Sequence, residues 1–153
     1  MPSHFLELLR RRPVLYDGGM GTMLFAAGLL DGESPEPWNW ERPEVVSGIY
    51  QSYFDAGSDV VQTNTFGGTP IKLSERDLEN RTYDANYLAA QALRKVCPEG
   101  RFVAGDVGAL GEILKPVGGD TKEEFTDNFK AQGEGALDGG VGVISLEVLY
   151  SLH

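Results

Sequence analysis

The sequence predicts an α/β protein with a parallel sheet covered by helices on both faces. Near-continuously apolar segments of strand length alternate along its 153 residues with amphipathic segments of helix length, in the order β-α-β-α-β-α-β. The twenty glycines gather in clusters beside the apolar segments, where tight turns between elements belong. A polar residue ends each expected strand, at intervals of 46, 43 and 41 residues, each enough for one βα unit. These residues are Asp17, Thr63, Asp106 and Glu147.

In the first third of the chain, the expected elements follow from their start and stop signals. Ser3 can cap a first helix that ends before Pro13. Pro43 suits the first turn of a longer helix that Gly57 ends. In order, we expect a helix over 3–12, a buried strand over 14–16, a brief helix over 22–30, a loop with both tryptophans over 31–42, and the helix from Pro43 to Gly57.

The rest of the chain repeats the same alternation. A β-branched run predicts a second strand, and the segment Thr121–Glu124 has the pattern of a capping box that opens a helix. A glycine pair, Gly139–Gly140, ends that helix. In order, we expect a strand over 59–66, a polar connector over 67–80, a helix over 83–96, a strand over 102–107, a glycine-rich loop, the helix from 121 and a strand over 141–147.

Charge and composition exclude several classes of protein. Thirteen basic and twenty-three acidic residues give a formal charge of −10, which repels phosphate backbones and argues against a nucleic-acid partner. No apolar run reaches about 18 residues, and the first residues lack a signal-peptide pattern, so we expect no membrane contact. The single cysteine, Cys97, excludes an internal disulfide and a zinc site made of several thiolates of this chain alone. It makes the cytoplasm the default compartment.

The strongest local pattern is a glycine turn directly after the first expected strand, Asp17-Gly18-Gly19-Met20-Gly21-Thr22. Such a turn exposes backbone N–H groups that favour an anion, while the Asp17 carboxylate can accept hydrogen bonds from an ammonium group. Together they could bind both ends of an α-amino acid. The alternative is a structural turn in which Asp17 caps the following helix.

Polar side chains at the other strand ends form a second pattern. In a parallel sheet the carboxyl ends of all strands meet at one edge, so these side chains should converge there. Gln62-Thr63-Asn64-Thr65 offers more hydrogen-bonding side chains than a strand needs, and Asn64 is disfavoured within a strand. Asp106 and Glu147 end buried strands and therefore require a partner, either a ligand ammonium or an Arg or Lys of the protein.

Six blocks of sequence, in this order, resemble the homocysteine S-methyltransferase family, whose domain also occurs in cobalamin-dependent methionine synthase and betaine–homocysteine methyltransferase. The resemblance runs from about Val14 to Glu147. The blocks are Asp17-Gly18-Gly19-Met20-Gly21-Thr22, Arg42-Pro43-Glu44-Val45-Val46, the segment 56–66, Ala104-Gly105-Asp106-Val107-Gly108, Pro116-Val117-Gly118 and the strand that ends in Glu147.

The resemblance implies a (β/α)₈ barrel of the TIM type and transfer of a methyl group to the thiol of homocysteine, as in methionine synthesis. It implies that Asp17 and Glu147 hold the amino group of homocysteine, and that the Gly18–Gly19 turn and Thr63 help to bind its carboxylate. We add Asn64 and Asp106 to the expected substrate-binding residues and assign no catalytic residue.

The sequence departs from the family at the metal. Family members hold a zinc ion with three cysteines of their second half, and Cys97 matches none of them. We therefore expect residues 1–153 to form one partial domain: the first four βα units, or N-terminal half, of the barrel. We expect the chain alone to bind no cofactor and to be inactive without a second half. Its open edges favour a homodimer or a complementary half-barrel chain as partner.

Two other hypotheses remain open. The chain could be a non-catalytic module that binds a small ligand or another protein, which needs no zinc cysteines. It could also be a nucleotide-binding, doubly wound sheet, which suits the same order of elements. The second of these lacks the full glycine fingerprint, because Leu24 stands where the third glycine is required.

Overall fold

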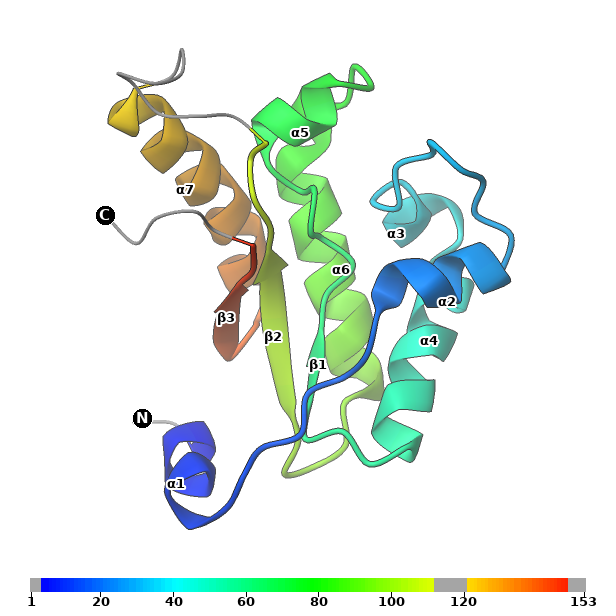
Figure 1. Ribbon diagram of the computed structural model, residues 1–153, viewed down its shortest axis with the longest axis vertical. Coiled ribbons are helices and arrows are strands. Elements are labelled where there is room, and N and C mark those ends of the chain that lie inside the picture. The colour runs from blue at the N-terminus through cyan, green and yellow to red at the C-terminus, as the bar shows by residue number, and fades with distance from the viewer. Residues whose placement is uncertain (1–3, 112–120, 149–153) are drawn as a thin grey trace.

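A computed structural model describes residues 4–111 and 121–148 of the chain. They contain a parallel sheet in the order β1 (Val60–Gln62), β2 (Phe102–Val107) and β3 (Val143–Leu146). The helices are α1 (His4–Arg11), α2 (Met20–Ala26), α3 (Trp38–Glu41), α4 (Pro43–Asp55), α5 (Pro70–Ser74), the 3₁₀ helix η1 (Glu79–Arg81), α6 (Thr82–Val96) and α7 (Lys122–Gly139). The alternation of strands and helices is confirmed (Figure 1).

The first expected strand, 14–16, is reduced to a single parallel bridge between Tyr16 and Val60. The carbonyl of Leu15 accepts hydrogen bonds from the backbone of Asp59 and Val60, but the N–H of Leu15 donates to the Asp59 carboxylate instead of to a strand. That carboxylate also pairs with Arg12 and Arg101. Side-chain bonds therefore replace most of the ladder, and the described residues contain three full strands and one parallel bridge at the position of the expected first strand.

The other strands and the long helices lie where the sequence predicts them. The strand expected over 102–107 has these bounds, whereas those expected over 59–66 and 141–147 are shorter. Thr121 and Glu124 form the capping box that opens α7, and Gly140 ends the helix with φ +91°. The brief helix expected over 22–30 lies over Met20–Ala26.

The expected loop and connector contain short helices that lack a long apolar period. The loop 31–42 holds α3, and the connector 67–80 holds α5 and η1. The local signal for α5 was present: Thr69 caps a helix whose first residue is Pro70.

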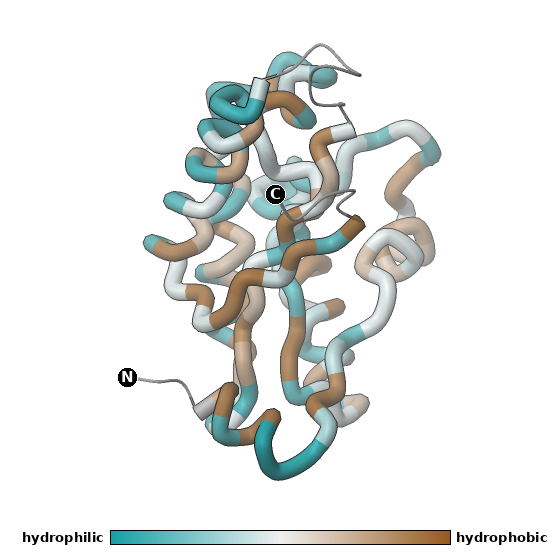
Figure 2. The backbone as a smooth tube through the Cα atoms, turned by 60° about the vertical axis from the view of Figure 1, so that its left-hand side comes forward, coloured by the Kyte–Doolittle hydropathy of each residue, from teal (hydrophilic) through white to brown (hydrophobic). Residues whose placement is uncertain are grey.

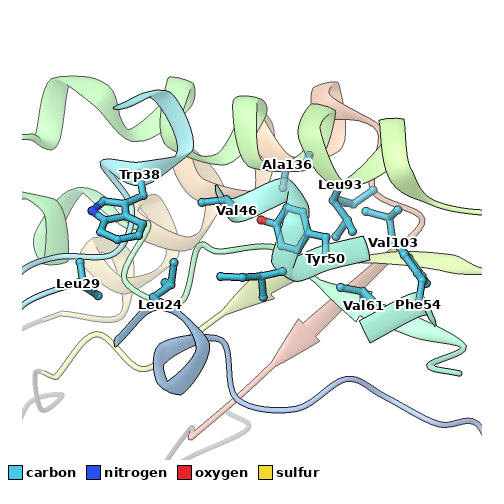
Figure 3. Close-up of a cluster of buried hydrophobic side chains, with 13 residues drawn as sticks. Leu24, Leu29, Trp38, Val46, Tyr50, Phe54, Val61, Leu93, Val103 and Ala136 are labelled. Atoms are coloured by element: carbon cyan, nitrogen blue, oxygen red, sulfur yellow. The ribbon is translucent and has the colours of Figure 1, made fainter. Parts of the chain in front are cut away.

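Helices α4, α6 and α7 pack on the same face of the sheet, and not on both faces as expected (Figure 1). The core between them joins α4, through Tyr50 and Phe54, to α6, through Leu93, and to Val61 and Val103 of the strands (Figure 3). Hydrophobic stretches follow the strands, and hydrophilic ones lie on the outer turns of the helices (Figure 2). Helices on one face of a parallel sheet are the arrangement of a (β/α) barrel wall.

The outer strand of the sheet, β3, leaves apolar side chains uncovered. Ile144 lies on the helix face, because a Cβ atom at Gly105 would meet both Ile144 and Ala136 of α7. Ile144 is 40% exposed and Leu146, two residues on, is 58% exposed. Within residues 4–111 and 121–148, no helix is both long and apolar enough to cross a membrane.

Candidate functional site

A cavity of about 460 Å³ lies at the carboxyl ends of the strands. Its walls come from the segment after the Tyr16 bridge, the loop before α3 and the ends of all three strands. The lining residues are Asp17, Gly18, Gly19, Met20, Gly21, Pro35, Gln62, Thr63, Asn64, Thr65, Phe66, Asp106 and Glu147. All seven residues that we expected to bind substrate line this one cavity, so the predicted convergence of the strand ends is confirmed.

A second cavity, also of about 460 Å³, lies between the loop before α3 and the segment after α5. Trp38, Arg42 and Arg76 are among its lining residues, and it contains none of the predicted site residues. The carboxylates that the sequence analysis identified all lie at the first cavity, which is therefore the candidate site.

Asp17 directly follows the Tyr16 bridge, and its side chain is held by the neighbouring strand, β1. Its Oδ2 accepts a hydrogen bond from the backbone N–H of Gln62 at 2.8 Å, whereas its Oδ1 is buried without a partner. Burial raises the pKa of Asp17 to about 6, and the charge of Glu147 adds to the rise. Helix α2 is capped by Gly19 without a side-chain bond, so Asp17 does not act as its cap.

Asp106 is the most deeply buried carboxylate of the cavity. Its residue is 9% exposed, and its Oδ1 has no hydrogen-bond partner. Burial raises the pKa of Asp106 to about 7, with further increases from Glu147, Asp17 and Glu36. In the part of the chain that the structure describes, no Arg or Lys forms an ion pair with Asp17, Asp106 or Glu147. The cavity thus gathers acceptors and negative charge without a protein cation.

Glu147 is positioned by contacts with the two other strands of the sheet, β2 and β1. Its backbone N–H donates to the carbonyl of Val107 at 2.9 Å, and its Oε1 accepts from Nε2 of Gln62 at 2.8 Å. The Oε1 atom of Gln62 is buried without a partner. Gln62 was not among the predicted site residues, although it opens the polar pattern at 62–65 that drew attention to this strand end.

Thr63 and Asn64 use their side chains to build the wall of the cavity. The Thr63 hydroxyl accepts from the backbone N–H of Asp106 at 3.0 Å and shares a hydrogen bond of 2.6 Å with the hydroxyl of Thr65. Nδ2 of Asn64 donates to the carbonyl of Pro35 and to Oδ1 of Asn39. Strand β1 ends at Gln62, so Asn64 stands outside the strand in which it would be disfavoured.

The glycine turn closes the cavity beside helix α4. The hydroxyl of Tyr53 donates to the carbonyl of Gly19 at 3.0 Å, and a Cβ atom at Gly18 would lie 3.1 Å from the Tyr53 ring. The close contact explains glycine at position 18 and keeps the backbone at the edge of the cavity.

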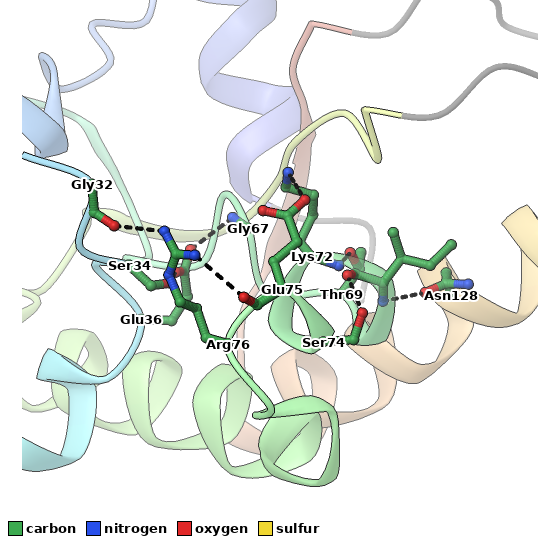
Figure 4. Close-up of polar contacts among 11 residues, drawn as sticks. Gly32, Ser34, Glu36, Gly67, Thr69, Lys72, Ser74, Glu75, Arg76 and Asn128 are labelled. Atoms are coloured by element: carbon green, nitrogen blue, oxygen red, sulfur yellow. Dashed lines mark hydrogen bonds and ion pairs between the residues drawn. The ribbon is translucent and has the colours of Figure 1, made fainter.

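Polar contacts fix the loop that carries Pro35 (Figure 4). Oε1 of Glu36 accepts from the backbone N–H of Gly67 at 2.8 Å, and its other oxygen accepts from Ser34. Arg76 ties the same loop to the segment after α5 by donating to the carbonyl of Gly32 at 2.6 Å. The cavity wall is therefore preorganised by bonds between segments that are distant in sequence.

The described residues do not fit a thiolate-bound metal. Within 4–111 and 121–148, no group of three or more His, Cys, Asp or Glu side chains is placed to hold a metal ion. Cys97 caps the carboxyl end of α6, shortly before the amino end of β2, and so lies at the end of the sheet opposite the cavity. Burial raises the pKa of its thiol.

Comparison with known proteins points to one family. The sequence model of a family described as homocysteine S-methyltransferase matches residues 14–153. Methionine synthase of Mycobacterium tuberculosis (strain ATCC 25618 / H37Rv) is 34% identical over 163 aligned residues, which cover 98% of this chain and 14% of that protein. Methionine synthase of Mycobacterium leprae (strain TN) is 32% identical, with coverage of 98% and 13%.

Solved structures give the same result for the fold. The metallated form of the homocysteine methyltransferase MmuM from Escherichia coli superposes with a TM-score of 0.78 at 24% sequence identity, covering 92% of this chain and 56% of that one. Its oxidized form gives a TM-score of 0.74 at 25% identity, with coverage of 90% and 53%. The chain thus spans about half the length of MmuM and a small part of the two synthases. Since the family model matches nearly the whole of it, the chain belongs to the homocysteine S-methyltransferase family.

Proposed function

We propose that this chain supplies the amino-acid-binding part of an enzyme that transfers a methyl group to the thiol of homocysteine. The carrying observation is a cavity that combines buried carboxylates with no ion-paired cation among the described residues. An unpaired buried carboxylate is costly, and a bound ammonium group relieves that cost. In this proposal, Asp17 and Glu147 bind the ammonium group, and the Gly18–Gly19 turn receives the carboxylate.

The remaining expected residues act in this proposal by shaping the cavity. Thr63 and Asn64 fix the strand end and the Pro35 loop, so their hydrogen bonds hold the ligand-facing groups in place. Asp106 adds a third carboxylate at the bottom of the cavity. Preorganised groups of this kind lower the entropic cost of binding.

We propose that the groups that activate the thiol come from outside residues 4–111 and 121–148. Members of the family are expected to use zinc, and the described residues do not fit such a site. The proposed partner is a complementary half barrel or a second copy, placed along the open edge of β3 with its exposed Ile144 and Leu146. The single cysteine favours the cytoplasm as compartment.

Calorimetric titration with L-homocysteine tests the proposed function. We expect binding by the wild-type chain at pH 7.5, and a loss of affinity of at least about tenfold in Asp17→Asn and in Glu147→Gln, since each removes a charged partner of the ammonium group. Asp127→Asn, an exposed change on α7, is the matched control and should leave the affinity unchanged. Equal affinity in all four proteins would refute the assignment.

A second candidate, a non-catalytic module that binds a small ligand, is favoured by the position of Cys97 opposite the cavity. The two candidates differ in their need for a partner. Methionine formation that appears only when a chain with the three cysteines is added supports the enzyme. Ligand binding without any such partner, and without activity, supports the module.

A further inference from the structure

Three buried oxygen atoms without a hydrogen-bond partner come from residues that line the candidate cavity. They are Oδ1 of Asp17, Oε1 of Gln62 and Oδ1 of Asp106. A buried acceptor without a donor costs free energy, and native structures contain few of them. The two other such atoms among the described residues, in Asn86 and Gln132, belong to side chains that do not line the cavity. Unpaired acceptors are therefore concentrated at this cavity.

No donor among the described residues lies within hydrogen-bond distance of the free Oδ1 of Asp106, although the backbone N–H of Val107 interacts with the carboxyl group. Asp17, Glu36 and Glu147 face it with negative charge from three segments. From α4, the Tyr50 hydroxyl accepts from the backbone N–H of Asn64 and keeps its own O–H as a donor, but it is not within hydrogen-bond distance of Oδ1 of Asp106. From α7, Nε2 of Gln132 donates to the backbone carbonyl of Asp106 and not to its carboxylate. In the empty cavity a water molecule or a proton on the carboxyl group can supply the missing donor, and in the occupied cavity the ligand can supply it.

An ammonium group has three N–H donors and one positive charge, which matches three acceptors in an acidic, buried setting. We propose that Gln62 and Asp106 complete, with Asp17, a three-point cradle for the ammonium group of the bound amino acid, and that Asp106 releases a proton when this group binds. The inference rests on the proposed function and adds two ligand-binding residues to it. The O–H bond of the neutral Asp106 carboxyl breaks, its proton passes to the buffer, and the ligand keeps its ammonium charge.

Gln62 has a double role in this arrangement. Its Nε2 donates to Glu147 at 2.8 Å, which leaves Oε1, a buried atom without a partner, as the acceptor of this amide. Glu147 thus shares an N–H of the amine with one of the three acceptors of the cradle, and it also determines which atom of the Gln62 amide is left as an acceptor. An amide oxygen accepts from N–H but gives nothing to a carboxylate, so Gln62 distinguishes the two ends of an amino acid.

The cradle makes amino-acid binding depend on pH. Because burial raises the pKa of Asp106 to about 7 and that of Asp17 to about 6, both carry protons to a different degree in the empty cavity at pH 6.5. Together they should release about one proton on binding at that pH, most of it from Asp106. The affinity should rise on the order of twentyfold from pH 5.5 to 7.5 through Asp106 alone.

The test is calorimetry of the full chain with L-homocysteine at pH 6.5 in two buffers of different ionisation enthalpy, which counts the protons released. The comparison ligand is 4-mercaptobutanoate, which has the same thiol and carboxylate but no amine. We expect about one proton released with homocysteine, none with 4-mercaptobutanoate, and clearly less than with the wild-type chain when homocysteine binds to Asp106→Asn. Gln62→Met should weaken homocysteine at least about fivefold and leave 4-mercaptobutanoate unchanged. Asp127→Asn is the control.

The outcomes separate this inference from the proposed function. Homocysteine that binds without proton release, or releases the same number of protons from Asp106→Asn, overturns the cradle and leaves the proposed function standing. A wild-type chain that binds neither homocysteine nor methionine overturns both. The proton count is measured on the wild-type chain, so the inference can be overturned even if a variant does not fold.

Discussion

The negative charges of Asp17 and Asp106 are unfavourable for folding but useful for binding a ligand at the candidate site. Burial without a cation makes their charged forms unfavourable in the folded chain, while the same charge is what a ligand ammonium requires. Asp59 shows the contrasting case within the same fold. It is also buried, but Arg12 and Arg101 pair with it and hold its pKa well below the usual range. The difference between the two environments marks the cavity as a place for a ligand and Asp59 as a structural anchor.

We predict that Asp106→Asn stabilises the chain at pH 8 and has little effect at pH 4. The pKa of Asp106 is raised on folding to about 7, so the folded state binds the proton more strongly than the unfolded chain. The contribution of Asp106 to stability is therefore fully present below about pH 4 and is lost as the pH rises through about 7. Because asparagine cannot ionise, the variant does not lose this contribution. Its free energy of unfolding at pH 8 should exceed that of the wild-type chain by about 1–4 kcal/mol.

Denaturant unfolding at both pH values measures this difference, with Asp127→Asn as the exposed control. A variant less stable than the wild-type chain at pH 8 would contradict the burial of an unpaired charge.

The location of these carboxylates was predictable because strand ends converge at one edge of a parallel sheet. The inward bonds of Thr63 and Asn64 were not, because they depend on partners such as Pro35 and Asn39 whose loop position no local pattern encodes.

Helix α7 packs closely on α6, and this contact places β3 and Glu147 beside the rest of the site. Along α7, Gly135 and Gly139 approach α6 so closely that a Cβ atom at Gly135 would lie 2.6 Å from the carbonyl oxygen of Tyr83. At Gly133, on the same helix, a Cβ atom would meet nothing within 4 Å. Two glycines in one helix therefore have different reasons to be there.

We predict opposite effects for alanine at these two positions. Gly135→Ala forces the α6–α7 backbones apart and should cost about 1–3 kcal/mol of unfolding free energy. Gly133→Ala should raise it by about 0.5–1 kcal/mol, because alanine favours a helix and has room there. Thermal or denaturant unfolding distinguishes them, and a neutral Gly135→Ala would show that the helices are not in tight contact.

At the level of elements, sequence patterns were reliable where one segment carries its own signal. The capping box, Pro43 and the apolar strands 102–107 and 141–147 predicted α7, α4, β2 and β3 to within a few residues. The prediction of a strand over 14–16 failed because the backbone N–H of Leu15 donates to the side chain of Asp59, which lies 44 residues away in the sequence. Short helices α3 and α5 lack the length over which a period can be recognised.

The whole molecule is a parallel sheet with its long helices on one face, as in the part of MmuM that it matches. A doubly wound, nucleotide-binding sheet would carry helices on both faces, so the observed layering favours the barrel type. The sequence alone could not decide this, since the order of elements is the same in both. In the barrel interpretation, the open edge of β3 is where the next strand would pair.

We predict that the purified chain associates through this edge. Exposed Ile144 and Leu146 beside an unpaired strand favour a homodimer or binding to a complementary half barrel. Light scattering measures the mass, and Leu146→Lys should shift the equilibrium towards the monomer because it places a charge at the contact. A monodisperse monomer of the wild-type chain over the micromolar range would exclude the homodimer.

A crystal structure of the chain with L-homocysteine tests the central claim most directly, namely that the strand-end cavity binds an amino acid by its ammonium group. The account predicts the ammonium nitrogen at hydrogen-bond distance, about 3 Å, from the carboxylates of Asp17 and Glu147. A ligand bound instead in the second cavity, with its carboxylate on Arg42 or Arg76, would contradict it.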